Sequence, residues 1–355
     1  MAERSASLSG DANRKARVTK AINALIPVCW PFVGTTMVFT LVAIFSLRIW
    51  VPDLFTNFYF HFLLLQIPFA IGLALSGHRK QALSVLPFIL ICFFQVGSLY
   101  IPDKTSSSAS SGTNATVKLL QINVLSQNKQ YDDVVSAVKK SGADLALLEE
   151  VTPVWLEKLT AGLAPEYAVV QASARDDNFG IALFSKIPVL ESRILPLGYV
   201  QTPTVAAKFK LGESGAVCGL LATHVLPPLS AQYFRERNLQ YDELRLFGNK
   251  YSKNLIIMGD LNTTSWSPFF QDLIKTGHLH DSTRGAGLQP TWPAYLYPFG
   301  IGLEHCLYSD AFKCIKRSVG SDVGSDHLPL IVELQLQRDL EKDFEKDLEQ
   351  SHEKQ

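Results

Sequence analysis

Residues 255–262, Leu255-Ile-Ile-Met-Gly-Asp-Leu-Asn262, decide the fold class of this chain. The apolar run predicts a buried strand, and Asp260 and Asn262 place a carboxylate and an amide at its end. Four other apolar runs also have polar residues at one end: Asn123 in residues 119–124, Glu149 and Glu150 after 144–148, His224 after 218–223, and Asp326 and His327 before 328–332. Five predicted strands therefore present groups that bind a hard cation or move protons.

Outward from this run, predicted strands and helices fill residues 117–337. Apolar runs predict strands at 117–125, 144–148, 167–171, 180–185, 205–209, 217–224, 255–259, 303–308 and 328–336. Apolar residues at helical spacing predict helices at about 130–141, 153–163, 229–252 and 267–276. Several strands follow one another directly, so the pattern indicates an α/β fold in which two mixed sheets pack face to face with helices outside.

Charge and cysteine content narrow the function classes only slightly. The chain has 33 Lys and Arg and 33 Asp and Glu among 355 residues, so its formal net charge is zero. Tight, sequence-independent binding of DNA usually needs a basic excess, and the balance argues against it. A nuclease that grips its substrate locally stays open. The cysteines have no spacing suited to structural zinc, and a bond between Cys306 and Cys314 is left open.

Residues 21–102 differ in composition from the rest of the chain. They carry few charges and contain three apolar stretches, at about 25–47, 58–77 and 82–101. Each is close to the roughly 20 residues that a helix needs to cross a bilayer. A cleaved signal peptide has one short apolar region, so we expect a transmembrane region of about three helices and an integral membrane protein.

Basic residues predict the orientation of these helices. Residues 1–20 are net basic, and His78-Arg79-Lys80 separates the second stretch from the third. Positive segments tend to stay in the cytoplasm, so three spans place the N-terminus inside and the catalytic domain outside an inner or plasma membrane. Loss of one span would reverse the side of the domain.

Two polar segments flank the predicted catalytic domain at 117–337. Residues 103–116 are rich in Ser and Thr and predict a flexible linker that lets the domain move relative to the membrane. Residues 338–355 form a charged tail in which Leu340, Phe344 and Leu348 recur every four residues, a spacing that suits a marginal surface helix. A partner-binding role for the tail stays open.

The residue types at the strand ends point to metal-assisted hydrolysis. Asparagine, glutamate and aspartate oxygens suit magnesium, manganese or calcium, and an aspartate beside a histidine near that metal suits activation of water. Each residue alone has a simpler interpretation: a turn for Asn123, a helix cap for Glu150 and a core histidine for His224. Their joint placement at strand ends favours one shared site.

Five segments carry a resemblance to a known family: Gln121-Ile-Asn123, Leu147-Leu-Glu-Glu150-Val, Thr223-His224-Val-Leu-Pro227, Gly259-Asp260-Leu-Asn262 and Gly324-Ser-Asp326-His327-Leu-Pro329. They resemble the endonuclease/exonuclease/phosphatase superfamily, which includes DNase I-like nucleases, abasic-site endonucleases, neutral sphingomyelinases and inositol polyphosphate 5-phosphatases. The resemblance covers about 117–337. It implies a four-layer α/β/β/α sandwich with the site at one edge of the packed sheets.

The resemblance also implies a metal site. Glu150 matches the principal metal ligand, Asn123 lies beside it, and Asp326 completes or supports the site. The expected cofactor is Mg²⁺ or Mn²⁺. Lys186 matches a position where the family often has a basic residue. Arg235 or Arg237 could reach the substrate from the helix after His224, although a solvated surface position is the favoured interpretation for each arginine.

Catalytic roles follow the same correspondence. Asp260 and Asn262 would orient the attacking water and the scissile phosphate, His327 would be the general base or a phosphate ligand, and His224 would stabilise the phosphate or protonate the leaving oxygen. One residue departs from the family pattern, because Glu304 stands where an aspartate usually braces the catalytic histidine. The longer side chain makes that contact less secure.

Three interpretations of the function stay open. A phosphodiesterase or nuclease acting on nucleic acid ranks first, and a phospholipid or sphingolipid phosphodiesterase ranks second, although a membrane tether favours lipid. A catalytically silent receptor or scaffold is the non-enzyme alternative, and the intact motifs oppose it. Trp292 and Tyr295 would either stack on a base or sugar or pack within their loop.

Overall fold

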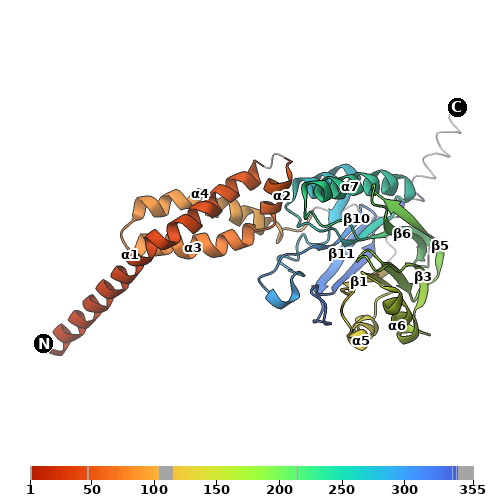
Figure 1. Cartoon of the computed structure of the whole chain (residues 1–355), viewed down its shortest axis with the longest axis horizontal. Helices are drawn as coiled ribbons and strands as arrows, with labels where there is room; N and C mark the ends of the chain where they lie inside the picture. The colour runs from red at the N-terminus through yellow and green to blue at the C-terminus, as the bar shows by residue number, and fades with distance from the viewer. Residues whose placement is uncertain are drawn as a thin grey trace. The chain divides into compact units, whose positions relative to one another are not determined.

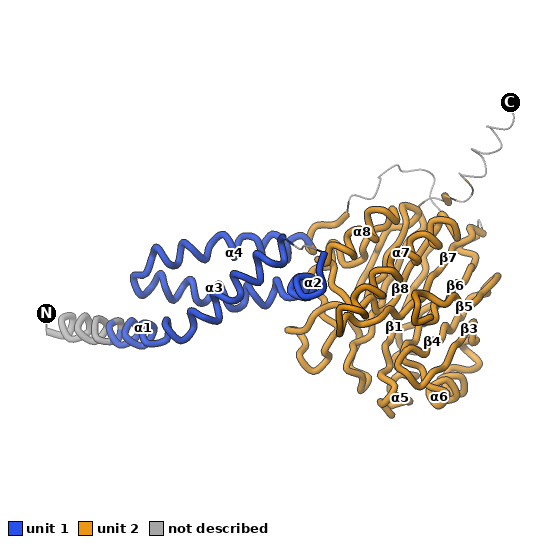
Figure 2. Tube along the Cα trace, turned by 45° about the horizontal axis from the view of Figure 1, so that its top comes forward, with its two compact units in different colours: residues 1–98 blue, residues 99–355 orange. Residues whose placement is uncertain are grey.

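The computed structural model describes residues 2–45, 48–103, 115–213, 215–337, 339–340 and 342, with the backbone alone for residues 2–13 and 15. The chain forms two compact units, residues 1–98 and residues 99–355, which Figure 2 shows in different colours. Most of the predicted linker at 103–116 and of the charged tail at 338–355 lies outside the described residues.

The first unit is helical. Its elements are α1 Ala2–Ile44, α2 Trp50–Thr56, α3 Tyr59–Leu75 and α4 Arg79–Ser98. Ala16–Ile44 and Arg79–Ser98 are long and apolar enough to cross a membrane, and α2 with α3 makes a third candidate span only if this pair, bent by 65°, crosses as one. The expectation of about three spans therefore becomes two, or three with a broken helix. The reason is that α2 ends before Asn57, which leaves α3 with only 17 residues.

The first unit exposes many apolar side chains and buries polar contacts between its helices. Phe32 and Leu75 are each 70% exposed, whereas Gln66 is fully buried. The Gln66 amide donates to the hydroxyl oxygens of Thr36 and Thr40 over 3.1 and 3.4 Å. Polar contacts between helices inside an apolar surface are typical of helices that pack in lipid.

Two six-stranded sheets form the centre of the second unit. Their strand orders are β11-β12-β1-β2-β4-β3 and β5-β6-β7-β8-β10-β9. The strands are β1 Thr116–Asn123, β2 Leu145–Glu149, β3 Ala168–Ser173, β4 Ile181–Ser185, β5 Val189–Leu197, β6 Thr202–Leu211, β7 Ala216–Thr223, β8 Leu255–Asp260, β9 Leu279–Asp281, β10 Glu304–Ser309, β11 Phe312–Val319 and β12 Leu330–Leu336. Both sheets are mixed, since β1 runs parallel to β2 and β7 runs parallel to β8 among antiparallel neighbours.

Helices cover the outer faces of the two sheets (Figure 1). Helices α5 Tyr131–Ser141 and α6 Pro153–Leu163 pack on the first sheet, where Trp155 shares a buried cluster with Leu148. Helices α7 Ala231–Tyr251 and α8 Pro268–Gly277 pack on the second, where Phe270 shares a cluster with Ile257. A third cluster, which contains Leu147, fills the space between the sheets. The expected four-layer α/β/β/α sandwich is confirmed.

Three strands were not expected from the sequence, namely β5, β9 and β11. All three lie at an edge of their sheet. Edge strands have one neighbour and often expose polar side chains, so their apolar pattern is weak. In β5, for example, Glu191 and Arg193 are exposed.

Candidate active site

Four buried polar residues lie near one end of their strands and point toward the space between the sheets. Side chains alternate between the two faces of a sheet, so positions two apart share a face. Gln121, Glu149, Asp260 and Glu304 each lie two positions from a residue of the core between the sheets, and none is more than 1% exposed. The core therefore changes from apolar to polar at one edge of the sandwich.

The Gly-Asp-x-Asn turn after β8 is shaped by a close backbone approach. Gly259 has φ of 156°, and a Cβ there would lie 1.6 Å from the carbonyl oxygen of Thr223. Only glycine fits such a position. The turn is held by the Asp260 amide, which donates to Glu149 Oε1 at 2.9 Å, and by the Asn262 amide, which donates to Asp260 Oδ1 at 2.8 Å.

Asn262 also joins two loops of the second sheet. Its side-chain amide donates to the carbonyl oxygen of Val225 at 2.8 Å, and its own φ is 49°. Asparagine adopts the left-handed backbone more readily than other residues with a side chain, which suits it to this turn. Asn262 therefore fixes the turn after β8 against the loop that follows β7.

His327 and Glu304 form the hydrogen-bonded pair that the resemblance led us to expect. Glu304 Oε1 contacts His327 Nδ1, and Asp260 Oδ2 lies 3.8 Å from the same nitrogen. Each of these three residues has one nitrogen or oxygen atom that could bind a metal ion, and the three atoms all lie within 4.8 Å of one another. The brace is kept although glutamate replaces aspartate, because Glu304 begins β10 directly opposite Asp260 in antiparallel register.

The electrostatics assign different charges to the two histidines. Burial opposes protonation of His327, but the charge and hydrogen bond of Glu304 outweigh it and raise the pKa of His327 to about 10. Burial, with the charge of His327, lowers the pKa of His224 to about 3. His327 is therefore an imidazolium at neutral pH, and His224, which lies 3.7 Å from Asp260, is neutral.

Asp260 has a pKa suited to proton transfer near neutral pH. Burial raises its pKa to about 7, with His327 opposing this shift and Glu304 adding to it. A group whose pKa lies near the working pH can both accept and release a proton efficiently.

Asn123, Glu150 and Asp326 lie close to this trio, since Glu150 is hydrogen-bonded to Asn123 and its pKa responds to the charges of Asp326 and His327. The Asn123 amide nitrogen donates to Glu150 Oε1 at 3.0 Å, and Glu150 has φ of 59°. Burial raises the pKa of Glu150, and the negative charge of Asp326 raises it further. Asp326 Oδ1 is buried and has no hydrogen-bond partner in the part of the chain that the structure describes. A carboxyl group whose pKa is raised by burial and by a neighbouring acid, beside an unpartnered carboxylate oxygen, fits a hard divalent cation.

One expected substrate-binding residue does not reach this edge. Lys186 follows Ser185, which pairs with Leu145 at the opposite end of β2 from Glu149, and its ammonium bonds to Glu166 at 2.6 Å. The antiparallel register of β4 is the physical reason, and this assignment is corrected. Arg235 is exposed on α7, and its role in substrate binding stays a prediction.

Arg237, the alternative to Arg235, is buried and donates to the carbonyl oxygen of Asn262 at 3.3 Å. It therefore supports the turn that carries Asp260. Two residues apart on a helix differ by about 200° in direction, so only one of the two arginines points toward the strands.

Three residues support the site through contacts that the sequence did not predict. The Ser325 hydroxyl donates to the carbonyl oxygen of Asn123 at 2.7 Å, and Trp292 Nε1 donates to Asp326 Oδ2 at 3.2 Å. Arg317 donates to the carbonyl oxygen of Glu304 at 2.9 Å from the other sheet. Ser325 lies inside the Gly-Ser-Asp-His segment, so the motif could have identified it. Arg317 had no signal, because its strand β11 was not predicted.

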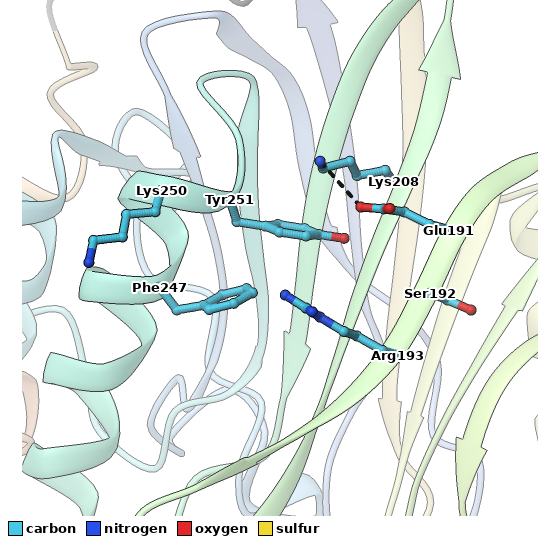
Figure 3. Close-up of a pocket in the computed structure, with 7 residues that line it drawn as sticks. All are labelled: Glu191, Ser192, Arg193, Lys208, Phe247, Lys250 and Tyr251. Atoms are coloured by element: carbon cyan, nitrogen blue, oxygen red, sulfur yellow. Dashed lines mark ion pairs between the residues drawn. The ribbon is translucent and has the colours of Figure 1, made fainter.

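A hollow of about 390 Å³ lies apart from these residues, between β5, β6 and the end of α7 (Figure 3). Two of its three cationic side chains are engaged: Lys208 pairs with Glu191 at 3.2 Å and lies over the ring of Tyr251, and Arg193 lies over the ring of Phe247. The carboxylate-rich sheet edge is therefore the better candidate for chemistry. All five cysteines are free thiols, which answers the open question about Cys306 and Cys314.

Comparison with known proteins agrees with this fold. Similar solved structures include a humanised D. rerio TDP2 (15% identity, TM-score 0.51, 62% of this chain and 98% of that one), a Bacteroides thetaiotaomicron endonuclease/exonuclease/phosphatase family protein (17%, 0.54, 62% and 98%) and the human Nocturnin catalytic domain with bound sulfate (18%, 0.51, 62% and 94%). At these identities the likeness shows the fold alone. A search of curated proteins gives no match. The sequence profile of the Endonuclease/Exonuclease/phosphatase family matches residues 120–327, more than half of the chain, and the chain therefore belongs to that family.

Proposed function

We propose that this chain is a membrane-anchored, divalent-metal-dependent phosphodiesterase that hydrolyses P–O bonds by in-line attack of water. The observation that carries the proposal is the convergence of two groups at one sheet edge. Asn123 is hydrogen-bonded to Glu150, the pKa of Glu150 responds to the charges of Asp326 and His327, and His327 lies 3.8 Å from Asp260. A hard cation and a proton-transfer pair are the two requirements for hydrolysis of an anionic ester.

The metal assignment rests on the donor set. Glu150, Asp326 and Asn123 would hold Mg²⁺ or Mn²⁺, which would neutralise phosphate oxygens and lower the barrier to attack. The partnerless Asp326 Oδ1 and the raised pKa of Glu150 support this assignment, because a cation would satisfy both groups.

The chain's own residues would divide the remaining work. Asp260, with its pKa near 7, would accept the proton of the attacking water. His327, kept protonated by Glu304, would donate to a non-bridging phosphate oxygen, so the role of phosphate ligand is favoured over that of general base. Neutral His224 would donate a hydrogen bond and Asn262 would orient the phosphate. The released oxygen would take its proton from solvent.

Hydrolysis of bis(p-nitrophenyl) phosphate by the full chain in detergent tests this proposal. Activity should need Mg²⁺ or Mn²⁺ and be lost with EDTA. His327→Ala and Glu150→Gln should each lower kcat by about 10²–10⁴-fold, the range of a positioned catalytic group. His278→Asn and Glu157→Gln change exposed residues of the same kinds and serve as matched controls.

The outcome also separates the enzyme from a silent receptor or scaffold. Metal-independent hydrolysis, or full activity in both site variants, would contradict the proposed site. A chain that hydrolyses neither this ester, nor DNA or RNA, nor a phospholipid would support the non-enzyme alternative.

A further inference from the structure

An uncharged loop with exposed aromatic side chains projects beside the candidate active site. Residues 285–303 contain no charged residue. Within them, Tyr295 is 81% exposed, Leu296 47%, Tyr297 58% and Phe299 54%. Residues 293–300 are called the aromatic tip below, and Figure 1 shows this blue loop reaching away from the strands. Contiguous exposed apolar side chains of this kind mark an interaction surface.

The stem of the loop ties the aromatic tip to the catalytic residues. Trp292 and Ile301 exchange backbone hydrogen bonds of 2.9 and 2.7 Å, which closes the stem. The amide of Ala294 donates to the carbonyl oxygen of Asp326 at 2.8 Å, and Trp292 Nε1 donates to the Asp326 carboxylate. Whatever binds the aromatic tip is therefore held next to Asp326.

The start of the loop is bound to the chain directly after the last candidate membrane span. The amides of Gly285 and Gly287 donate to the carbonyl oxygen of Leu99 at 2.8 and 3.1 Å. Leu99 follows Ser98, the last residue of that span, so one peptide bond separates the two. Tyr100 and Ile101 are themselves 57% and 66% exposed. The loop thus begins where the chain would leave the bilayer.

We propose that the aromatic tip inserts into the interface of the bilayer and that the substrate is a phosphodiester of a membrane lipid headgroup, an inference that rests on the proposed phosphodiesterase function. Tyrosine and phenylalanine on an uncharged loop suit the membrane interface, where an apolar ring is buried and a hydroxyl stays hydrated. We assign the bilayer as the partner of the aromatic tip because the start of the loop is bound to Leu99, directly after a candidate span.

A single-stranded nucleic acid is the competing occupant of the aromatic tip. Stacking of bases on aromatic side chains is usually accompanied by basic residues that track the phosphates. Residues 285–303 contain none. The composition therefore favours lipid over nucleic acid.

A fluorescent probe on the aromatic tip tests insertion without relying on catalysis. The full chain carries Tyr295→Cys, labelled with NBD, in a background where the partly exposed Cys29 and Cys314 are serine. In phosphatidylcholine vesicles with spin-labelled lipid, we expect a blue shift and at least twofold quenching. Tyr199→Cys, 83% exposed on the turn between β5 and β6, is the reference and should respond to neither. Equal responses of the two probes would overturn the proposal, as would a response at 295 to oligo(dT) but not to lipid.

A second arm measures the consequence for substrate choice. The variant Tyr295→Ser, Leu296→Ser, Tyr297→Ser, Phe299→Ser should lower the rate on phospholipid vesicles relative to bis(p-nitrophenyl) phosphate by at least tenfold. The control variant replaces four exposed apolar residues elsewhere: Leu190, Tyr199, Leu246 and Ile315. An unchanged ratio would contradict a lipid substrate. If the chain hydrolyses no phosphodiester at all, the phosphodiesterase proposal fails, while the probe still decides whether the aromatic tip inserts.

Discussion

Glu304 occupies the position where the family usually has an aspartate, and its longer side chain still reaches His327. The contact is possible because Glu304 lies directly opposite Asp260 at the start of β10, with the His327 ring next to both. The main consequence is electrostatic, since a buried carboxylate keeps His327 protonated. Residue identity at 304 thus sets the charge state of the site.

Replacement of Glu304 by glutamine should change the pH dependence of activity. The carboxylate raises the pKa of His327 to about 10, so the imidazolium persists through neutral pH. Without that charge, the effect of burial is opposed less strongly, by Asp260 and Asp326, so the pKa of His327 should fall. In Glu304→Gln, kcat should decline at a lower pH than in the wild type. A pH–rate profile in which the alkaline limb stays in place would contradict a cationic His327.

Gly259 should tolerate no side chain. A Cβ would lie 1.6 Å from a carbonyl oxygen, so Gly259→Ala must displace β7 or β8 and should destabilise the second unit by about 3 kcal/mol or more. Gly142→Ala is the control, because Gly142 also has positive φ but has nothing within 4 Å of its Cβ position, and should cost about 1 kcal/mol. Thermal unfolding followed by intrinsic fluorescence compares the two. Equal losses would mean that backbone strain, rather than the close approach, matters at 259.

At the scale of elements, the strand β9 holds the segment 99–103. His280 on β9 lies between two carboxylates, with Nε2 at 2.6 Å from Asp310 and Nδ1 at 3.6 Å from Asp103. Together with the hydrogen bonds at Leu99, this contact fixes residues 99–103 within the second unit. The predicted linker therefore begins with a residue, Asp103, that is already attached to the second unit.

This contact should make the attachment of residues 99–103 depend on pH. The hydrogen bond to Asp103 raises the pKa of His280, with burial opposing and Asp310 adding. A histidine whose pKa is raised by folding contributes its full stabilisation below its pKa in the unfolded state, near 6.5. That stabilisation is lost as the pH rises through its pKa in the folded state. Hydrogen exchange of residues 99–103 should accelerate over that range beyond the intrinsic pH effect. The substitution His280→Gln should remove this additional acceleration. If the additional acceleration persists in that variant, His280 is not its source.

At the scale of the whole molecule, the number of spans decides which side of the membrane holds the second unit. The basic residues of 1–20 and the His78-Arg79-Lys80 loop share one side only if α2 and α3 together cross the bilayer once. We therefore expect three crossings and an extracytoplasmic catalytic unit in an inner or plasma membrane. Reporter fusions after Gly77 and at the C-terminus should fall on opposite sides, with the first in the cytoplasm. The reverse pattern would mean two crossings and a cytoplasmic catalytic unit.

The sequence by itself determined the family, the sandwich and the polar residues at its edge, from Asn123 to His327. It could do so because strand alternation and short motifs are local properties that one chain displays. Only the tertiary structure decided that Lys186 lies at the far end of its sheet, that Arg237 rather than Arg235 supports the Asp260 turn, and that Trp292 and Arg317 join the site. Those contacts depend on strand register, helix rotation and unpredicted edge strands, which arise from packing between segments far apart in the chain.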